Sequence, residues 1–366
     1  MNILFLPNNI SSISTSSVEA INRIPGNSAK GFYVNKYAHQ HIGGSDNFYF
    51  IGISRRKRPI KWILEEFKRH FIFRKLVKWA DVIHWVYDDI GLKKSEIRFL
   101  LRANKPSVIE WVGSDIRNPS LLAELNPYYK HAYSNGYEYA NYESPIQSTN
   151  NQEKFKGYKA IPLVNPEMAL FLKKNLFPES YFVSPRMLLD NYEPQYPSIE
   201  NKRPLVVHSP TAKVAKGSEF IISVVEELQR ELDFDFKLLH QMPRAEVMKV
   251  VSRCDIFIDQ IILGMYGLAS CEAMCYGKPV MCYLMPAVLR NGLPEDCPIV
   301  NTSVETIKKN LKELLVDSSL RNNIGKKSRA YAECYFDSRK NARQLLDIYN
   351  KVIMKTEECE PNKTTS

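Results

Sequence analysis

The chain has no cysteine before Cys254, although it contains seven in its 366 residues. The cysteines form no pair at metal-ligand or redox spacing, and the apolar opening of residues 1–6 is too short for a secretory signal. We therefore expect a protein of the reducing cytoplasm that has no metal site. The sequence also lacks any run near the roughly 20 apolar residues that a membrane-spanning helix needs, so we expect no integral membrane segment. Peripheral attachment to the inner face of the cell membrane stays open.

Acidic residues are too few to balance the basic ones, and the formal net charge is +10. The excess is concentrated between Arg55 and Trp79, where ten Lys or Arg stand against two Glu. Apolar side chains such as Trp62, Phe67 and Phe71 recur there near helical spacing. A basic helix of this kind is typical of a segment that binds an anionic membrane surface, but an ordinary helix with its aromatic side chains in the core explains the same pattern. No recognised nucleic-acid-binding module surrounds it, so we expect no nucleic-acid partner.

Residues 255–284 show the clearest pattern of secondary structure. A β-branched apolar run ends at Gly264, helical spacing begins at Gly267, and Gly277 and Pro279 end that helix before a second apolar run. This order predicts a strand, a crossover helix and a parallel strand. Ligands of such sheets bind beyond the carboxyl ends of the strands, and N–H groups at a helix start favour an anion. We therefore expect a ligand site around the turn that ends at Gly267.

The segment YGLASCEAMCYGKPV, residues 266–280, resembles the donor-site motif of GT-B glycosyltransferases of the retaining, nucleotide-sugar-dependent kind. These are the group 1 or family 4-like enzymes of bacterial surface polysaccharide assembly. The resemblance implies an α/β protein with two Rossmann-like parallel-sheet domains facing a central cleft, and a C-terminal helix that returns to the first domain. It also implies that Tyr266, Gly267 and Leu268 contact the donor and that Glu272 accepts the ribose hydroxyls. An ionised carboxylate is an acceptor-only group, which suits a vicinal diol.

The segment HSPTAKVAKGSEF, residues 208–220, resembles the loop of the same family in which two cations approach the donor diphosphate. By position, Lys216 matches the usual lysine before glycine, and Lys213 stands where close relatives often carry arginine. The resemblance therefore assigns both lysines to donor binding, where a lysine acts as a point charge against phosphate. The alternative for each is a solvated surface lysine.

Residues 113–117 follow a predicted strand at residues 107–112 and resemble the Gly-Ser-Asp-hydrophobic-Arg segment of many such transferases. This resemblance makes Asp115 the catalytic candidate and Arg117 a candidate anchor for an acidic acceptor. An aspartate that caps the next helix would explain Asp115 equally well. Two polar residues of the family pattern are absent: its cleft histidine is Val112 here, and its sugar-side glutamate is Gly264.

The remaining chain suggests less chemistry. A buried strand is expected at residues 81–86, with His84 as a core histidine. Residues 126–159 are rich in Tyr, Asn and Ser, and we interpret them as a loop-rich surface or as a sugar-recognition segment. We divide the chain into an acceptor-side domain (1–188), a proline-containing linker (189–203), a donor domain (204–336), a crossing helix (337–356) and a disordered tail (357–366).

The resemblance implies a retaining, metal-independent transferase that moves a hexose-like sugar from a nucleotide-sugar donor to a sugar or lipid-linked acceptor. The nucleotide sugar is a co-substrate, and no other cofactor is expected. Three alternatives stay open: a nucleotide-sugar 2-epimerase, which shares the fold; an inactive GT-B partner or scaffold protein; and a peripheral membrane-binding module. The replacements at Val112 and Gly264 argue against the epimerase and favour the inactive partner.

Overall fold

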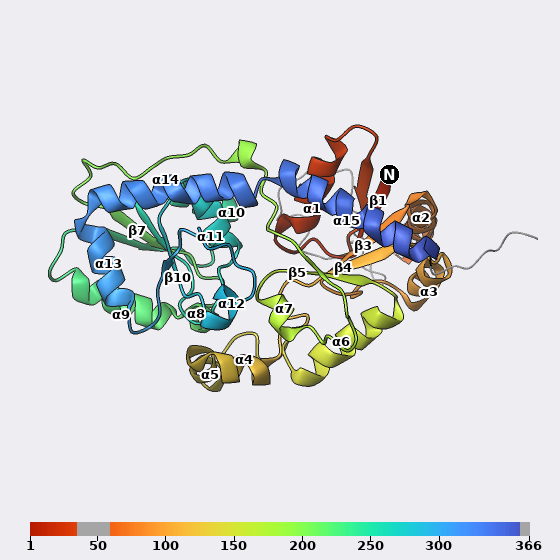
Figure 1. The fold of residues 1–366 in the computed structure, drawn as a ribbon, viewed down its shortest axis with the longest axis horizontal. Coiled ribbons are helices and arrows are strands. Elements are labelled where there is room, and N and C mark those ends of the chain that lie inside the picture. Colours follow the sequence, from red (N-terminus) through yellow and green to blue (C-terminus); the bar gives the residue numbers. More distant parts are fainter. Residues whose placement is uncertain (35–58, 359–366) are drawn as a thin grey trace, which may run out of the picture.

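The first half of the chain forms a six-stranded parallel sheet with strand order β2-β1-β3-β4-β5-β6 (Figure 1). The computed structural model describes residues 1–34 and 59–358. The strands are β1 (Asn2–Leu6), β2 (Ser28–Gly31), β3 (Val82–Val86), β4 (Ser107–Glu110), β5 (Ile161–Val164) and β6 (Tyr181–Phe182). The helices are α1 (Ile13–Asn22), α2 (Pro59–Trp79), α3 (Lys94–Arg102), α4 (Pro119–Leu125), α5 (Pro127–Ser134), α6 (Pro145–Gly157) and α7 (Met168–Phe171).

The first strand shows why this sheet is covered on both faces. Leu4 and Leu6 belong to one hydrophobic cluster, whereas Ile3 and Phe5 belong to another, and all four side chains are fully buried. Successive side chains of a strand point to opposite faces, so a continuous apolar run fits a strand with helices on either side. His84 of β3 is also fully buried and bonded to Tyr349 and Glu110, which confirms the expected core histidine.

The second half forms a five-stranded parallel sheet with strand order β11-β10-β9-β7-β8. Its strands are β7 (Leu205–His208), β8 (Asp235–Leu238), β9 (Ile256–Ile258), β10 (Val280–Cys282) and β11 (Val300–Asn301). Its helices are α8 (Lys213–Lys216), α9 (Ser218–Leu228), α10 (Arg244–Val251), α11 (Leu268–Cys275), α12 (Pro286–Leu289), α13 (Ile307–Val316) and α14 (Ser318–Tyr335). The predicted strand, helix and strand of residues 255–284 are thus β9, α11 and β10.

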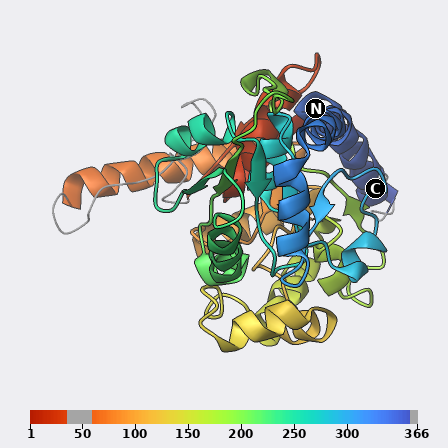
Figure 2. The ribbon, with the colours of Figure 1, turned by 90° about the vertical axis from the view of Figure 1, so that its left-hand side faces the viewer.

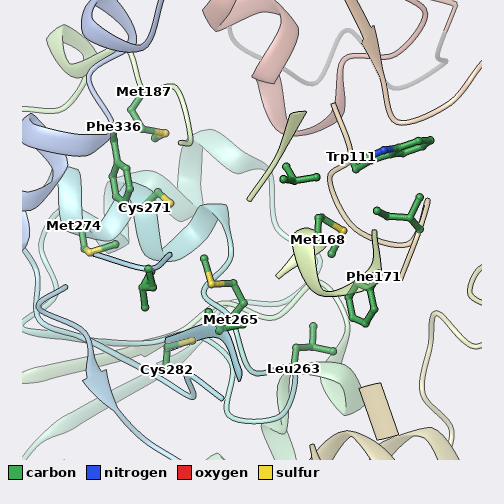
Figure 3. Close-up of a cluster of buried hydrophobic side chains, with 14 of the residues drawn as sticks. Trp111, Met168, Phe171, Met187, Leu263, Met265, Cys271, Met274, Cys282 and Phe336 are labelled. Atoms are coloured by element: carbon green, nitrogen blue, oxygen red, sulfur yellow. The ribbon is translucent and has the colours of Figure 1, made fainter. Parts of the chain in front are cut away.

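The chain crosses between the two sheets twice, and the crossings are bonded to each other. Met187 N–H donates to the Phe336 carbonyl at 2.7 Å, and Ser338 N–H donates to the Met187 carbonyl at 3.0 Å. Figure 3 shows the Met187 and Phe336 side chains next to one another at this junction. After it, α15 (Ser338–Glu358) lies along the first domain, where Tyr349 packs in the cluster that contains Phe5. The predicted fold class, including the returning C-terminal helix, is confirmed.

The two halves also meet across the cleft between the sheets. Asn126 Nδ2 donates to the Ile262 carbonyl at 2.7 Å, and the N–H groups of Val214 and Ala215 donate to the Glu138 carboxylate at 2.8 and 2.9 Å. One hydrophobic cluster runs through both domains, and Figure 3 shows side chains of both around the cleft. The arrangement of the two sheets is therefore held by polar and apolar contacts together. The predicted domain boundaries themselves stay predictions.

The loop-rich structure expected for residues 126–159 is wrong, because α5 and α6 occupy most of that stretch. Each helix begins with a capping side chain followed by proline: Asn126 accepts the N–H groups of Tyr128 and Tyr129, and Ser144 accepts that of Gln147. These are standard helix-start signals that the irregular spacing of apolar residues obscured. Of the predicted disordered tail, residues 357 and 358 continue α15, and the rest lies outside the described residues.

Helix α2 confirms the predicted helical pattern over residues 59–79, but its two ends differ in their surroundings. Toward its C-terminus Phe73, Leu76 and Val77 are buried in the core. Toward its N-terminus it projects from the body of the molecule, as the orange helix in Figure 2 shows. That part carries an exposed apolar stripe at helical spacing, formed by Ile60, Ile63, Leu64, Phe67 and Phe71. Arg55 to Arg58 lie outside the described residues. Within the described chain, no helix is both long and apolar enough to cross a bilayer.

Helices α11 and α14 approach so closely that one glycine is required between them. A Cβ atom added to Gly325 of α14 would lie 2.4 Å from the Gly277 carbonyl oxygen. We predict that Gly325→Ala lowers the free energy of unfolding by about 1 to 3 kcal/mol, because backbone must move to relieve the overlap. Urea unfolding followed by circular dichroism measures the change.

Gly157→Ala, at the end of α6, is the matched control, because a Cβ atom there meets nothing within 4 Å. Alanine is the better helix former by about 1 kcal/mol, so this variant should be as stable as the wild type or more so. Equal stability of the Gly325 variant and the control would contradict the proposed close approach.

Candidate functional site

A cavity of about 420 Å³ lies between the two domains, where the carboxyl ends of both sheets meet. The first domain contributes the residues that follow β4, including Gly113 and Ser114, and the second contributes Tyr266, Gly267 and Leu268. This is where ligands of open parallel sheets bind. Three of the predicted donor residues therefore border the cleft.

Glu272 lies one helical turn beyond Leu268 on α11 and is only 5% exposed. Its Oε1 atom accepts hydrogen bonds from the Arg244 guanidinium and from the Tyr192 hydroxyl. No hydrogen bond within the described parts of the chain reaches the other oxygen, Oε2. The side chain borders a small cavity shared with Leu268 and Arg186, both of which also line the main cleft. One carboxylate oxygen is thus held in place, and the other is available to a ligand.

The charge state of Glu272 is set by opposing effects. Burial raises the pKa of Glu272 above its ordinary value, and the Arg244 charge and the Tyr192 hydrogen bond, which favour the ionised carboxylate, offset only part of that rise. The guanidinium therefore fulfils two roles at once: it orients the carboxylate and it favours the form that accepts hydrogen bonds.

Lys216 is paired with an internal carboxylate. Its Nζ atom lies 2.5 Å from Asp259 Oδ1, while Asp259 Oδ2 accepts the Gly267 N–H at 3.0 Å and the Ser270 hydroxyl at 2.6 Å. The lysine and the start of α11, both expected at the donor diphosphate, are therefore close together in space. The residue that joins them, Asp259, is one that sequence reasoning missed. Its only signal was an acidic side chain directly after the apolar strand β9.

Lys213 lies elsewhere. Its exposed side chain borders a separate groove of about 550 Å³ between α5 and α9, together with His131 and Phe220. The structure therefore does not bring Lys213 next to Lys216, and neither lysine is among the described residues that line the cleft. The assignment of Lys213 to the donor stays a prediction.

Asp115 is completely buried and bonded to its own turn. Its carboxylate accepts the N–H groups of Val112 at 2.8 Å, Gly113 at 2.7 Å and Ile116 at 3.0 Å. It is not among the described residues that line the cavity. The geometry is that of a turn-capping aspartate, and the catalytic role stays a prediction.

Arg117 does line the cleft, but its charge is already compensated. Its Nε atom lies 2.9 Å from Glu167, its Nη1 atom lies 2.6 Å from Glu143, and the hydroxyls of Tyr129 and Tyr137 also donate to Glu143. Two carboxylates on one guanidinium suit a residue that ties segments of the first domain together. The proposed contact with an acidic acceptor stays a prediction.

A second buried network at the cleft was not foreseen from the sequence. Glu110, at the end of β4, lies 2.5 Å from Arg186 Nη2 and 3.1 Å from His84 Nε2, and Tyr349 OH lies 2.6 Å from His84 Nδ1. Burial would raise the pKa of Glu110, but the Arg186 charge and the His84 hydrogen bond outweigh it and lower the pKa to about 2. The network therefore contributes stability above the ordinary glutamate range and loses it as the pH falls toward 2.

Tyr87, directly after β3, has a φ of 75°, which is unusual for a bulky residue. Its hydroxyl lies 2.9 Å from Ser114 Oγ, and Ser114 lines the cleft. Backbone strain of this kind persists only where the surrounding structure holds it in place, and it is commonly found at functional sites. Within residues 1–34 and 59–358, no group of three or more His, Cys, Asp or Glu side chains is arranged to hold a metal ion.

Comparison with known proteins shows the fold. No model of a protein family matches the chain, and no curated protein matches it by sequence. Among solved structures, sucrose-phosphate synthase from Thermosynechococcus elongatus is similar over 97% of this chain and 99% of its own, with a TM-score of 0.62 and 12% identity. Anabaena HepE in complex with UDP-glucose is similar over 96% and 100%, with a TM-score of 0.53 and 14% identity.

A putative UDP-N-acetylglucosamine 2-epimerase from Listeria monocytogenes is similar over 94% of both chains, with a TM-score of 0.51 and 11% identity. At these identities the likeness establishes the GT-B fold alone. The same fold supports different activities, so function must be argued from the site.

The position of Asp115 leads to a prediction about stability. Asp115→Ala leaves one buried and two partly buried N–H groups without their acceptor, and we expect the free energy of unfolding to fall by about 2 to 3 kcal/mol. Asn118→Ala is the control, because Asn118 caps α4 at a more exposed site by accepting the N–H groups of Ser120 and Leu121, and it should cost about 1 kcal/mol. Urea titrations compare both variants with the wild type. An Asp115 variant of unchanged stability would contradict the capping role.

Proposed function

We propose that this protein is a glycosyltransferase that transfers a sugar from a nucleotide-sugar donor to an acceptor hydroxyl. The observation that carries the proposal is the arrangement of Glu272: a buried carboxylate beside the cleft, with one oxygen fixed by Arg244 and the other without a partner in the described chain. Hydroxyl groups are the natural donors to such an oxygen. HepE, which shares the fold, was solved with UDP-glucose, and this supports a donor of the same class.

The donor would run from the Glu272 cavity into the main cleft. With its ribose at Glu272, its diphosphate would lie toward Leu268 and Lys216, because Leu268 borders both cavities and Lys216 approaches the same helix start. The backbone N–H groups at this helix start would stabilise the leaving phosphate, with a contribution from Lys216 that its pairing with Asp259 reduces. The sugar would then face the first-domain residues that line the cleft, where the acceptor enters.

The chemistry we propose is retaining and independent of metal. The leaving phosphate itself accepts the proton of the incoming acceptor hydroxyl, so no protein base is required. This suits the replacement of the family's cleft histidine by Val112 and of its upstream glutamate by Gly264. Surface polysaccharide or glycolipid assembly is the proposed setting, because the residue 113–117 segment resembles transferases of that process.

A 2-epimerase is the second candidate, favoured by one observation: a putative epimerase has the same fold. The acidic side chains at the cleft do not fit it well. Glu110 is paired with Arg186, and both Glu143 and Glu167 are paired with Arg117. Carboxylates held by arginines are poor proton acceptors, because the adjacent charge favours their ionised, weakly basic form. An inactive partner protein differs from both in binding a nucleotide sugar without turnover.

We also propose that the exposed stripe of α2 attaches the enzyme to an anionic membrane. Phe67 and Phe71 are 71% and 70% exposed, so these aromatics are not core residues. The stripe is flanked by Lys61 and Lys68, and the basic run Arg55 to Arg58 precedes it in the sequence. Apolar side chains that enter the headgroup region and cations that meet anionic lipid are the two components such binding requires. A lipid-linked acceptor would then be presented close to the first domain.

The donor site is tested by measuring binding and turnover with uridine, adenosine, guanosine and thymidine diphosphate sugars. We predict that Glu272→Ala weakens the binding of the preferred nucleotide sugar by about tenfold to a hundredfold, since a hydrogen bond to a charged group is worth about 1.5 to 3 kcal/mol. Glu246→Ala, on the exposed side of α10, is the control and should bind like the wild type. Calorimetry on the folded variants measures both affinities for comparison with the wild type. Unchanged affinity in Glu272→Ala would place the ribose elsewhere.

Membrane attachment is tested by sedimentation with vesicles that contain or lack anionic lipid. We predict that the wild type sediments with anionic vesicles and that Phe67→Ser/Phe71→Ser and Arg55→Glu/Arg56→Glu/Lys57→Glu/Arg58→Glu remain in the supernatant. The control, Tyr142→Ser/Ile146→Ser, removes side chains that are 61% and 73% exposed elsewhere in the first domain, and it should sediment like the wild type. A wild-type chain that stays in the supernatant at low salt would refute membrane attachment.

A further inference from the structure

Asp259 lies against the start of α11 at Gly267, a residue that lines the cleft, although Asp259 itself is not among the described lining residues. It follows β9 directly and is 1% exposed. It has three partners, one from α8 and two from the start of α11: the Lys216 ammonium group at 2.5 Å, the Gly267 N–H at 3.0 Å and the Ser270 hydroxyl at 2.6 Å. A cation, a backbone N–H at a helix start and a hydroxyl are the groups that commonly bind a phosphate. Here an internal carboxylate takes all three.

The local backbone is adapted to this carboxylate. A Cβ atom added to Gly267 would lie 3.3 Å from Asp259 Oδ2, so any larger residue would crowd the contact. Burial would raise the pKa of Asp259, but Lys216, Ser270 and Gly267 together lower it below its usual range, so the group is an anion. Lys216 and Asp259 therefore form a pair with no net charge.

An incoming diphosphate consequently meets less positive charge than the sequence indicates. Lys216 retains limited access, since its side chain is 12% exposed. The N–H groups of Leu268 and Ala269, the next two at the helix start, take part in no hydrogen bond within the described chain. A diphosphate can therefore contact the start of α11, but it does so beside a fixed negative charge.

We propose that Asp259 is a specificity-determining residue that limits how strongly the donor site holds a diphosphate, by neutralising Lys216 and occupying the Gly267 N–H. This inference rests on the proposed function. The nucleoside part of the donor then supplies most of the binding, through Glu272 and its surroundings. The nucleoside diphosphate product, which carries more negative charge than the nucleotide sugar, is held weakly and leaves readily.

The test compares how much a diphosphate adds to binding in three chains. Calorimetry measures dissociation constants for UDP, ADP, GDP and dTDP and for their parent nucleosides. For the preferred base, we define the diphosphate gain as the dissociation constant of the nucleoside divided by that of its diphosphate. In Asp259→Asn the negative charge is gone and Lys216 is free, so we expect the gain to rise about tenfold relative to the wild type. Asp259→Ser is measured in parallel, so that a poorly folding variant does not decide the result.

Asp255→Asn is the matched control. Asp255 lies at the opposite end of β9, is 6% exposed, and accepts the Leu205 N–H at 2.8 Å and the Asn201 side chain at 2.9 Å. The same chemical change there should leave the diphosphate gain at the wild-type value. A merely structural role for Asp259 would alter stability in both variants and the gain in neither.

The outcomes separate this inference from the proposed function. A wild-type chain that binds neither nucleosides nor diphosphates contradicts the proposed function and this inference with it. A wild type that binds both, with folded Asp259 variants whose diphosphate gain is unchanged or lower, overturns the inference alone. A raised gain in the Asp259 variants and not in Asp255→Asn supports it.

Discussion

Ionised side chains gathered at the edge of two parallel sheets can be buried only if each is paired, because isolated buried charge is costly. The pairs that line this cleft are Glu110 with Arg186 and Arg117 with Glu143 and Glu167. Beside it, around α11, Lys216 pairs with Asp259 and Glu272 pairs with Arg244. In every pair the partners come from different segments of the chain. The pairs therefore fix the loops and helix starts that follow the strands, and with them the shape of the cavity.

The same pairing limits what the cleft can bind. A ligand anion meets arginines and a lysine that already have carboxylate partners, so charge attraction alone would bind it weakly. Groups that retain hydrogen-bonding capacity then gain importance, above all Glu272 Oε2 and the N–H groups at the start of α11. At the start of α11 the second domain therefore offers a ligand hydrogen-bonding groups and not an unpaired positive charge.

The two domains are joined at the chain crossings and across the cleft. The crossings at Met187 and Phe336 are bonded to each other, whereas the contacts across the cleft combine hydrogen bonds, at Asn126 and Glu138, with apolar packing. The N-terminal part of helix α2 projects from the body of the molecule, and its exposed apolar stripe does not pack in the core.

The sequence by itself determined the fold class and the strand, helix and strand of residues 255–284, because apolar runs and the Gly and Pro residues that end them are local signals. The donor-binding role of that segment stays a prediction. The sequence left α5 and α6 unseen, although Asn126-Pro127 and Ser144-Pro145 carried the helix-start signal. Only the tertiary structure decided that Lys216 pairs with Asp259, 43 residues away. It also decided that Arg117 pairs with Glu143 and Glu167, 26 and 50 residues away. The outward direction of Phe67 and Phe71 was likewise settled only by the packing of α2. The physical reason is that periodicity specifies which elements form, whereas the partner of a charge depends on how the sheets and helices pack.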